Sequence, residues 1–408
     1  MNDEYRAAGR TGSGAVMGSK KLKAIVVSGN QRQKSANPEM LAEKVAESMS
    51  LIRENPVTGP KGGLHVYGTA VLVNIVNAHG AYSSRNFQQS YFPEADEQSG
   101  EKLAESYLTG TTGCWGGCPI VCGRKSFVPD GPFSVKYTEG PEYETIFALG
   151  SNCGVKELDA VIKANHFCNE FGIDTISMGG TIACAMELVE KGKIPEEKLL
   201  GFNLRFGDPP GAMVECVWRA AYKAGFGGAD LALGSRKLAE KYQAPEYAIN
   251  VKGMELPAYD PRPIQGGIGL EYATSNRGGD HVYGYTIPSE LLGIPEKSDP
   301  YSTEGKPEWT IFMQDLGSVI NSSVICLFTS FALGLPPQYA GMLQAITGME
   351  LDPEKLLKIG GERITNLERH MNNRYGFNRV QDALPKRLTA EPTPPPDLPG
   401  DRSLMCLK

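Results

Sequence analysis

The stretch that decides the fold class is 157–191, ELDAVIKANHFCNEFGIDTISMGGTIACAMELVEK. Apolar residues in its first half recur at spacings of three and four, which predicts an amphipathic helix; they are Leu158, Val161, Ala164, Cys168 and Phe171. Gly172 is expected to end this helix, and Asp174 or Thr175 to cap a second helix that runs to about Lys191 and stops at Gly192.

Outward from this pair, similar patterns predict helices over 40–52, 68–79, 213–224, 235–242, 313–332 and 354–372. The apolar centre of 21–29 (KLKAIVVSG) predicts a strand, and 247–251 is a second, shorter strand candidate. Gly-rich 1–20 and Gly-, Pro- and Cys-rich 109–141 are expected to be mostly loop. The fold class predicted is therefore mainly α with minor β.

Composition excludes several classes of protein. The chain has 408 residues, of which 41% are hydrophobic, so two or three packed domains are expected and global disorder is excluded. The net charge of −6 argues against a dedicated nucleic-acid binder. No apolar run is long enough to predict a membrane span, since polar residues interrupt 319–335, and the first residues lack the apolar core of a signal peptide. The protein is therefore predicted to be cytoplasmic.

Three cysteines lie within nine residues in 112–123, TGCWGGCPIVCG. A helix would align Cys114, Cys118 and Cys122 as inert core residues, but the Gly and Pro residues between them make a helix costly. An iron–sulfur cluster needs several thiolates close in sequence plus a distant one, and it is the interpretation that the pattern favours. Zinc, which more often takes paired C-x₂-C ligands, and purely structural thiols remain alternatives. Spacing does not choose a fourth ligand among Cys153, Cys168, Cys184, Cys216, Cys326 and Cys406.

Five further stretches resemble segments of the tungsten-containing aldehyde ferredoxin oxidoreductase family, in the family's order and over the chain up to about Leu388. They are 6–20 (RAAGRTGSGAVMGSK), 139–145 (EGPEYET), 168–177 (CNEFGIDTIS), 256–262 (LPAYDPR) and 273–279 (ATSNRGG). The resemblance implies two helical domains preceded by a β-rich pterin-binding domain. It also implies tungsten, or molybdenum, held by two pyranopterins beside one [4Fe–4S] cluster, with magnesium bridging the pterin phosphates.

The resemblance assigns roles to particular residues. It implies cluster ligands Cys114, Cys118 and Cys122 and, from the match of 324–328 (VICLF), Cys326. Well-known members have two residues between the first two cysteines, where this chain has three.

Two pterin-holding motifs of the form D-x-x-G-L-(D/C) appear as 169–174 (NEFGID) and 321–326 (NSSVIC). They imply pterin contacts from Asn169, Ile173, Asp174, Asn321 and Ile325. From the residues alone, Asp174 is a plain N-cap and Gly172 a plain helix stop.

The loop at the start of the chain matches the family's loop against the pterin and its phosphates, through Arg6, Ala7, Ala8 and Gly9, with Arg6 between cofactor and cluster. The loop matches neither the Walker A pattern nor G-x-G-x-x-G. Without the resemblance, a surface turn is the alternative.

Glu144 and His281 match the family's acid–base residues. An apolar context is expected to raise the pKa of Glu144; the alternatives are a solvated helix-start Glu and a surface His. His166 is not expected to bind a metal between subunits, because Lys163 stands where some relatives have Glu.

The expected domains are 1–34, the end of the pterin-binding domain, 35–250, a helical domain with three cluster cysteines, and 251–408, a helical domain with the fourth. In relatives, most of the N-terminal domain lies before the segment that corresponds to Met1, so a fragment or one half of a split enzyme is expected.

The function predicted is oxidation of a small aldehyde to a carboxylate, with electrons passing to ferredoxin or a similar carrier. The alternatives are an iron–sulfur electron-transfer module and an inactive fragment. A separately encoded N-terminal half and a second copy of the chain are the further partners considered.

Overall fold

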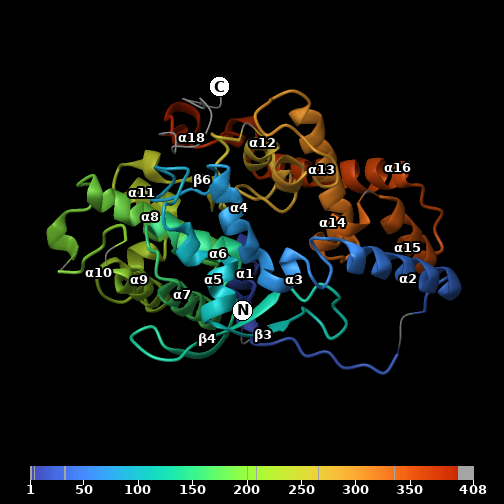
Figure 1. The fold of residues 1–408 in the computed structure, drawn as a ribbon. Helices are drawn as coiled ribbons and strands as arrows, with labels where there is room; N and C mark the ends of the chain where they lie inside the picture. The colour runs from blue at the N-terminus through green and yellow to red at the C-terminus, as the bar shows by residue number, and fades with distance from the viewer. Residues whose placement is uncertain are drawn as a thin grey trace.

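The computed structural model describes residues 2–3, 5–31, 34–199, 201–207, 209–264, 266–334 and 336–393, and within them the chain is mainly helical, which confirms the predicted fold class (Figure 1). The α-helices are α1 Ser13–Ser19, α2 Pro38–Glu54, α3 Gly63–Tyr67, α4 Leu72–Ala78, α5 Gly100–Ser106, α6 Tyr143–Leu149, α7 Leu158–Phe171, α8 Thr175–Glu190, α9 Pro210–Tyr222, α10 Gly225–Leu231, α11 Ser235–Lys241, α12 Gly267–Thr274, α13 Lys306–Ser322, α14 Ser330–Leu333, α15 Pro337–Thr347, α16 Pro353–Lys355, α17 Arg363–Arg374 and α18 Lys386–Ala390. The 3₁₀ segments are η1 Arg10–Gly12, η2 Gly68–Val71, η3 Ala95–Gln98, η4 Ser151–Cys153, η5 Glu196–Leu199, η6 Pro245–Tyr247, η8 Leu327–Thr329 and η10 Arg379–Gln381, and the π-helical segments are η7 Pro288–Leu292 and η9 Leu356–Glu362.

The strands form three small antiparallel sheets. These are β1 Asn2–Asp3 with β2 Arg6–Ala7, then β3 Leu108–Thr112 with β4 Gly123–Val128 and β5 Val135–Glu139, and finally β6 Asn250–Val251 with β7 Met254–Glu255. In the middle sheet the order is β3–β4–β5.

The α7–α8 pair forms as its sequence predicts. Gly172 adopts φ 71° at the end of α7, a conformation that glycine reaches without a Cβ penalty, and Ile173 N donates to Cys168 O at 2.8 Å. Asp174 then caps α8 by accepting from Ser177 N at 3.1 Å. Twelve of the 16 residues of α8 are buried, so the pair lies in the interior of one lobe of the molecule.

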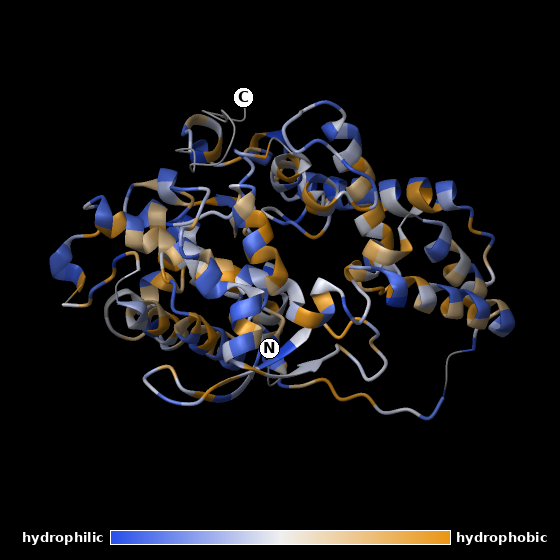
Figure 2. Ribbon diagram, in the orientation of Figure 1, coloured by the Kyte–Doolittle hydropathy of each residue, from blue (hydrophilic) through white to orange (hydrophobic). Residues whose placement is uncertain are grey.

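Two hydrophobic cores divide the helices, and hydrophobic residues alternate with hydrophilic ones along the helices of both lobes (Figure 2). The larger core takes residues from α4, α6 to α9, α11 and α12, and the smaller one takes residues from α2, α13, α14 and α15. Leu327 and Phe331 pack against both cores. The segment that follows α13 therefore lies at the junction of the lobes.

Most of the predicted helices are confirmed: 40–52 lies in α2, 68–79 in η2 and α4, 213–224 in α9, 235–242 in α11, and 354–372 in α16, η9 and α17. The single helix predicted over 313–332 is wrong. Val324 takes φ 55°, Ile325 N returns to Ile320 O, and Cys326 is extended before η8 begins. A Schellman-like end of this kind satisfies the last carbonyls of α13 and turns the chain sharply.

The region 109–141 is loop over just more than half of its length, as expected, but it also contains the three-stranded sheet in which β3 and β5 pair with β4. Two other expectations about strands and loops are wrong. Gly-rich 1–20 contains the β1–β2 hairpin and α1. The strand expected over 21–29 does not form, since among the described residues no strand lies beside it; Ile25, Val26 and Val27 are 68%, 90% and 88% exposed. The shorter candidate, 247–251, is a strand only at Asn250–Val251.

In the described ranges, no single helix is long and apolar enough to cross a membrane. The helices Lys306–Ser322 and Leu327–Leu333 have the required length and composition when they are taken together, but they are bent by 120° relative to each other.

Candidate active site and cluster site

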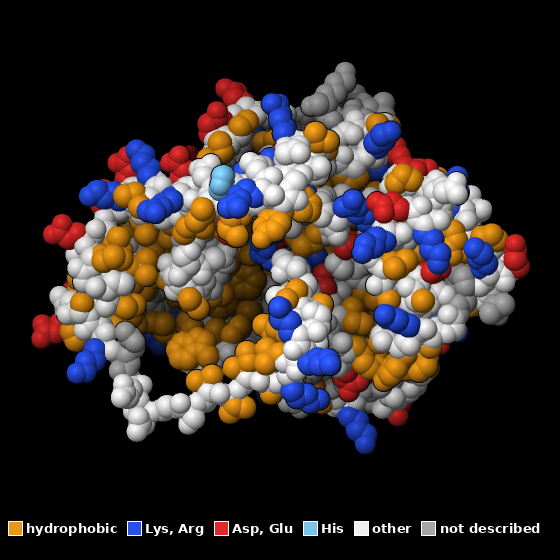
Figure 3. Space-filling model, turned by 180° about the vertical axis from the view of Figure 1, so that it is seen from behind, with side chains coloured by type: hydrophobic (Ala, Val, Ile, Leu, Met, Phe, Trp, Pro, Cys, Tyr) orange, Lys and Arg blue, Asp and Glu red, His pale blue; other side chains and the backbone are white. Residues whose placement is uncertain are grey.

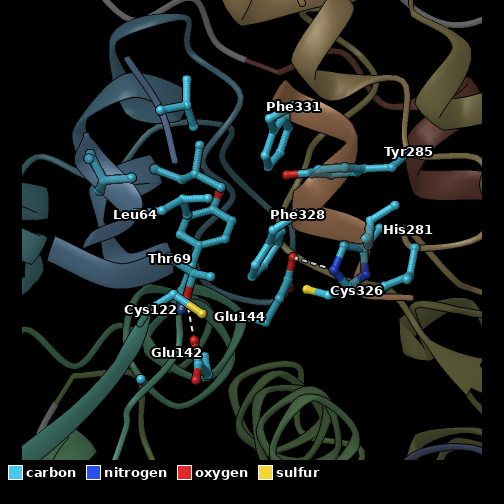
Figure 4. Close-up of a pocket in the computed structure, with 18 of the residues that line it drawn as sticks. Leu64, Thr69, Cys122, Glu142, Glu144, His281, Tyr285, Cys326, Phe328 and Phe331 are labelled. Atoms are coloured by element: carbon cyan, nitrogen blue, oxygen red, sulfur yellow. Dashed lines mark hydrogen bonds and ion pairs between the residues drawn. The ribbon is translucent and has the colours of Figure 1, made fainter. Parts of the chain in front are cut away.

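A cavity of about 660 Å³ lies between the two cores. Apolar side chains form most of its wall, and the chemically active groups gather at one end of it (Figure 4). From behind, the molecule is visibly hollowed, and hydrophobic side chains surround the hollow (Figure 3). The cavity is lined by three of the predicted cysteines, by both predicted acid–base residues and by Arg6.

Four thiols from two distant segments meet at this cavity. Cys114, Cys122 and Cys326 line it, while Cys118 packs beside them against the smaller core. Burial raises the pKa of Cys122 to about 12, with further increases from Glu142 and from the other three thiols. Burial likewise raises the pKa of Cys326, and Cys114 and Cys118 add to the effect. The effect of Cys114 and Cys118 on both of these thiols agrees with the place of the four residues at one end of the cavity.

The other candidate fourth ligands lie elsewhere. Cys153, Cys168, Cys184 and Cys216 are fully buried in the larger core, and all of the described cysteines are free thiols. Cys406 lies outside the described residues. The geometry therefore groups Cys326 with the three loop cysteines.

Arg124 holds the cysteine loop in place. The residue is 1% exposed, and its guanidinium donates to the carbonyl oxygens of Cys122, Val121, His65 and Val66, at 3.2, 2.8, 3.0 and 2.7 Å. Gly68, with φ 67°, leaves room for this contact, because a Cβ there would stand 2.8 Å from Cys122 O. Sequence reasoning missed Arg124, and no local signal marked it, because Lys125 and Ser126 follow it directly in the strand GRKSFV.

Glu144 and His281 face each other across the cavity, with Glu144 Oε1 and His281 Nε2 3.4 Å apart (Figure 4). Glu144 comes from α6 and accepts a hydrogen bond from Ala258 N at 2.9 Å. His281 follows the 273–279 loop and touches the rings of Tyr259 and Tyr285. The surface alternatives for both residues are wrong, since their side chains are only 13% and 15% exposed.

Burial keeps this pair uncharged near neutral pH. It raises the pKa of Glu144 to about 8, although Ala258 N–H and Arg10 oppose the shift. It lowers the pKa of His281 to about 4, although Asp280 opposes the shift. Glu144 Oε1 and His281 Nδ1 are buried and have no hydrogen-bond partner among the described residues. A carboxylic acid beside a neutral imidazole, each with a free polar atom, can pass a proton to or from a molecule in the cavity.

Arg6 joins the N-terminal hairpin to the cluster end of the cavity. It pairs with Glu139 and Glu142, each at 3.2 Å, and Thr69 Oγ1 donates to Glu142 at 2.6 Å. Glu142 also raises the pKa of Cys122, after the larger effect of burial. Glu142 was not predicted as a site residue, although it belongs to the 139–145 motif.

The 6–9 loop lies on the turn between α7 and α8. A Cβ on Gly9 would stand 2.7 Å from Asp174 N, so only glycine fits this approach. Arg10 pairs with Asp174 at 3.1 Å and donates to Glu255 O and Gly279 O. Asn2 donates to the carbonyls of Asn169 and Glu170 at 2.9 and 2.7 Å. The structure thus brings Arg6, Ala7, Ala8 and Gly9 beside Asn169, Ile173 and Asp174.

The second pterin motif lies at the end of α13. Asn321 is exposed there, and Ile325 packs against the smaller core, one residue before Cys326. Asp174 is an N-cap, as the residues alone predicted, and both of its described contacts use Oδ2. In the described part of the chain Oδ1 therefore remains a free acceptor.

The residues present fit a multi-iron cluster. Three free thiols line one end of the cavity and Cys118 lies beside them; in the described part of the chain, no group of three or more His, Cys, Asp or Glu side chains is placed to hold a single metal ion. A cubane places its cysteines around a larger body, whereas structural zinc draws four ligands to one atom. The donor set also fits a pterin edge, with Asp174 Oδ1, Asn169 and Asn321 as polar contacts and buried Arg10 Nε without a partner.

Comparison with known proteins shows which family this chain resembles. A family model described as "Aldehyde ferredoxin oxidoreductase, domains 2 & 3" matches residues 43–404, and one for the N-terminal domain of that family matches residues 1–29. Tungsten-containing aldehyde ferredoxin oxidoreductases of Pyrococcus horikoshii and Thermococcus kodakarensis are 48% and 47% identical over 97% of this chain, which spans 64% of their length. The "Aliphatic sulfonate oxidoreductase, WOR-like subunit" of Pyrococcus furiosus is 28% identical over 90% of this chain and 56% of its own.

A solved structure shares the fold: the "Active site complex BamBC of Benzoyl Coenzyme A reductase in complex with 1,5 Dienoyl-CoA", with TM-score 0.70 and 20% identity over 91% of this chain and 62% of that one. At that identity the likeness concerns the fold alone. The family match, in contrast, covers most of the sequence and includes the thiol and acid–base residues described above. The chain therefore belongs to the aldehyde ferredoxin oxidoreductase family of oxidoreductases.

Proposed function

We propose that this chain forms the helical part of an enzyme that oxidises a small aldehyde to a carboxylate, with electrons leaving through a [4Fe–4S] cluster to ferredoxin or a similar carrier. The overall reaction is RCHO + H₂O → RCOO⁻ + 3H⁺ + 2e⁻. One observation carries the proposal: a buried acid–base pair and three free thiols line the same largely apolar cavity, and a fourth thiol, Cys118, packs beside it. The names of the relatives support the reaction and the metal.

In this proposal Cys114, Cys118, Cys122 and Cys326 hold the cluster, and a tungsten or molybdenum bis-pyranopterin supplies the two-electron oxidation. Arg6, Ala7, Ala8, Gly9, Asn169, Ile173, Asp174, Asn321 and Ile325 contact the pterins, with magnesium at their phosphates. The domains are 1–34, 35–250 and 251–408, the location is cytoplasmic, and a homodimer is proposed.

Glu144 and His281 manage the protons that the reaction releases. His281 is neutral at pH 7 because its pKa is about 4, so it is a weak base that can accept a proton only transiently and pass it on. Glu144, with a pKa of about 8, can both accept and donate at mildly alkaline pH. Tyr259 and Tyr285 border the imidazole and limit its contact with water.

The acid–base role predicts the behaviour of Glu144→Gln in the complete, cofactor-loaded enzyme. Gln keeps the shape and can still accept from Ala258 N, but it does not ionise, so kcat should fall by about 10²–10⁴-fold. Metal content should stay at the wild-type level. Glu105→Gln, on the exposed side of α5, is the control. Glu142 does not serve as one, because it contacts Arg6 and Thr69. Wild-type kcat in Glu144→Gln across roughly pH 6–9, the span over which such a group titrates, would remove Glu144 from the mechanism.

The cluster assignment predicts iron content. Anaerobically prepared protein should contain about four iron atoms per chain, as one cubane requires. Cys326→Ala should lower this content or leave a three-iron cluster, whereas Cys216→Ala, in the larger core, should keep it unless the protein unfolds. Full iron retention in Cys326→Ala would exclude Cys326 as a ligand.

The second candidate is an iron–sulfur electron-transfer module, which needs only the four free thiols Cys114, Cys118, Cys122 and Cys326. The exposed apolar segment Ile25–Val27 is consistent with a strand that needs a partner from elsewhere. Elemental analysis decides between the two candidates: tungsten with iron supports the oxidoreductase, and iron alone supports the module.

Adding a separately produced N-terminal half should restore pterin binding and turnover, and robust turnover by the 408-residue chain alone would contradict that requirement.

A further inference from the structure

We propose that Arg124 places a fixed, buried positive charge beside the cluster and so raises its reduction potential, a role that rests on the proposed cluster at Cys114, Cys118, Cys122 and Cys326. Arg124 is a positioning residue in this proposal and touches no substrate. The inference starts from its surroundings, which are unusual for a buried cation.

Buried charges are normally paired with an opposite charge. Arg262, Arg387 and Lys306 follow that rule in this protein, through Asp260, Glu187 and Glu290. Arg124 is equally buried, yet among the described residues it has no carboxylate within ion-pair distance, and it is held by four carbonyl oxygens instead. Its charge is therefore solvated by the protein but not neutralised by a neighbouring anion.

The cysteine loop is the nearest place for the missing negative charge. Arg124 Nε binds the carbonyl of Cys122 at 3.2 Å, and Nη2 binds Val121 O at 2.8 Å. Val121 takes φ 52°, a left-handed conformation that a β-branched residue rarely adopts, so these bonds help to retain a costly loop shape. These two bonds place the guanidinium directly against the backbone of a proposed cluster ligand.

The sign of the effect follows from charge. A cubane with a 2+ core and four thiolates carries a net charge of −2, and one-electron reduction makes it −3. A fixed cation stabilises the more negative form more strongly, so it favours reduction and raises the potential. Net charge, hydrogen bonds and exposure are the factors by which a protein sets the potential of such clusters. Because the cation is buried, salt should screen it weakly.

Cluster reconstitution with iron and sulfide in the full chain tests the proposal, with the potential read from an EPR-monitored redox titration. Arg124→Gln keeps amide donors for the loop but removes the charge, so its cluster should titrate at a more negative potential than wild type, at low and high salt alike. Lys125→Met is the matched control. It removes one charge from the next residue of β4, whose side chain points to the opposite face of the strand, and it should leave the potential unchanged.

An unshifted potential in Arg124→Gln, with wild-type iron content, would overturn the proposal. If that variant does not fold, Arg124→Lys is the test. Lys keeps the positive charge, so its cluster should have a potential close to that of wild type. A much more negative potential in Arg124→Lys would also overturn the proposal. Failure of the wild-type chain to take up iron and sulfide would be a different result, since it would refute the proposed cluster site itself.

Discussion

At the scale of single residues, burial decides the chemistry of the site. The usual order of the pKa values of the acid–base pair is reversed, with Glu144 at about 8 and His281 at about 4, because burial penalises the charged form of each. Sequence reasoning correctly expected a raised pKa for Glu144 from its apolar neighbours. It had no basis for the lowered pKa of His281, whose aromatic neighbours Tyr259 and Tyr285 come from separate segments.

Glu144→Gln should stabilise the chain at alkaline pH. The folded state binds the Glu144 proton more tightly than the unfolded state does, since the pKa is about 8 against 4.5. Wild-type stability should therefore fall as the pH rises from about 4.5 to about 8, and the loss should be complete above that window. The variant lacks this loss and should gain on the order of 4 kcal/mol relative to wild type at pH 9, but little near pH 4. Urea unfolding at the two pH values measures the difference, and equal differences at both would contradict the burial argument.

At the scale of elements, short turns connect distant parts of the site. The turn from Gly172 to Asp174 ends α7, begins α8 and receives the 6–10 loop through Gly9 and Arg10. The turn after α13 likewise exposes Val324 and points Cys326 toward the other thiols. Both turns lie within the two motifs proposed to hold pterin.

Gly9→Ala should loosen the N-terminal loop. The new Cβ would approach the backbone of Asp174 to 2.7–2.9 Å, and overpacking against a rigid backbone typically costs about 1–3 kcal/mol. Hydrogen exchange at the amides of Gly12, Gly14 and Ser177 should therefore become faster. Gly18→Ala, in α1, is the control, because its Cβ meets nothing within 4 Å and a helical Ala is favoured. Unchanged protection in Gly9→Ala would show that the loop can shift without loss.

At the scale of the whole molecule, buried ion pairs join segments that are far apart in sequence. Arg387, in α18, donates two bonds of 2.7 Å to Glu187 of α8 and a third to Asn86 O. This contact attaches the C-terminal helix to the centre of the larger core. Arg262 and Asp260 make a similar pair beside it, with a bond from Arg262 to Phe87 O at 2.6 Å.

Arg387→Met should destabilise the chain by about 3–5 kcal/mol, because Glu187 would be left buried without its partner. The midpoint of urea unfolding should fall accordingly. Arg236→Met removes an exposed pair with Glu240, where both side chains are more than half exposed, and should cost no more than about 1 kcal/mol. Similar midpoints for the two variants would mean that Glu187 becomes protonated or hydrated at little cost.

The sequence by itself determined the features that depend on local chemistry. The α7–α8 pair, its Gly172 stop and its Asp174 cap follow from residues within one or two turns of each other. The non-helical cysteine loop follows from its Gly and Pro content in the same way. The sequence motifs indicated the family, and the family match confirms it. The roles of Glu144, His281 and the cysteines, which the same motifs implied, stay predictions.

Only the tertiary structure decided the features that depend on partners distant in sequence. The segment 21–29 has strand composition, but a strand needs a neighbour, and none lies beside it in the described chain. Pairing with β4 made strands of β3 and β5, where composition suggested loop. Six cysteines were equivalent by spacing, and packing separated Cys326 at the junction of two cores from the four buried in one of them. Burial and electrostatic neighbourhood are properties of the folded molecule, so the pKa values of Glu144 and His281 and the unpaired charge of Arg124 emerge only there.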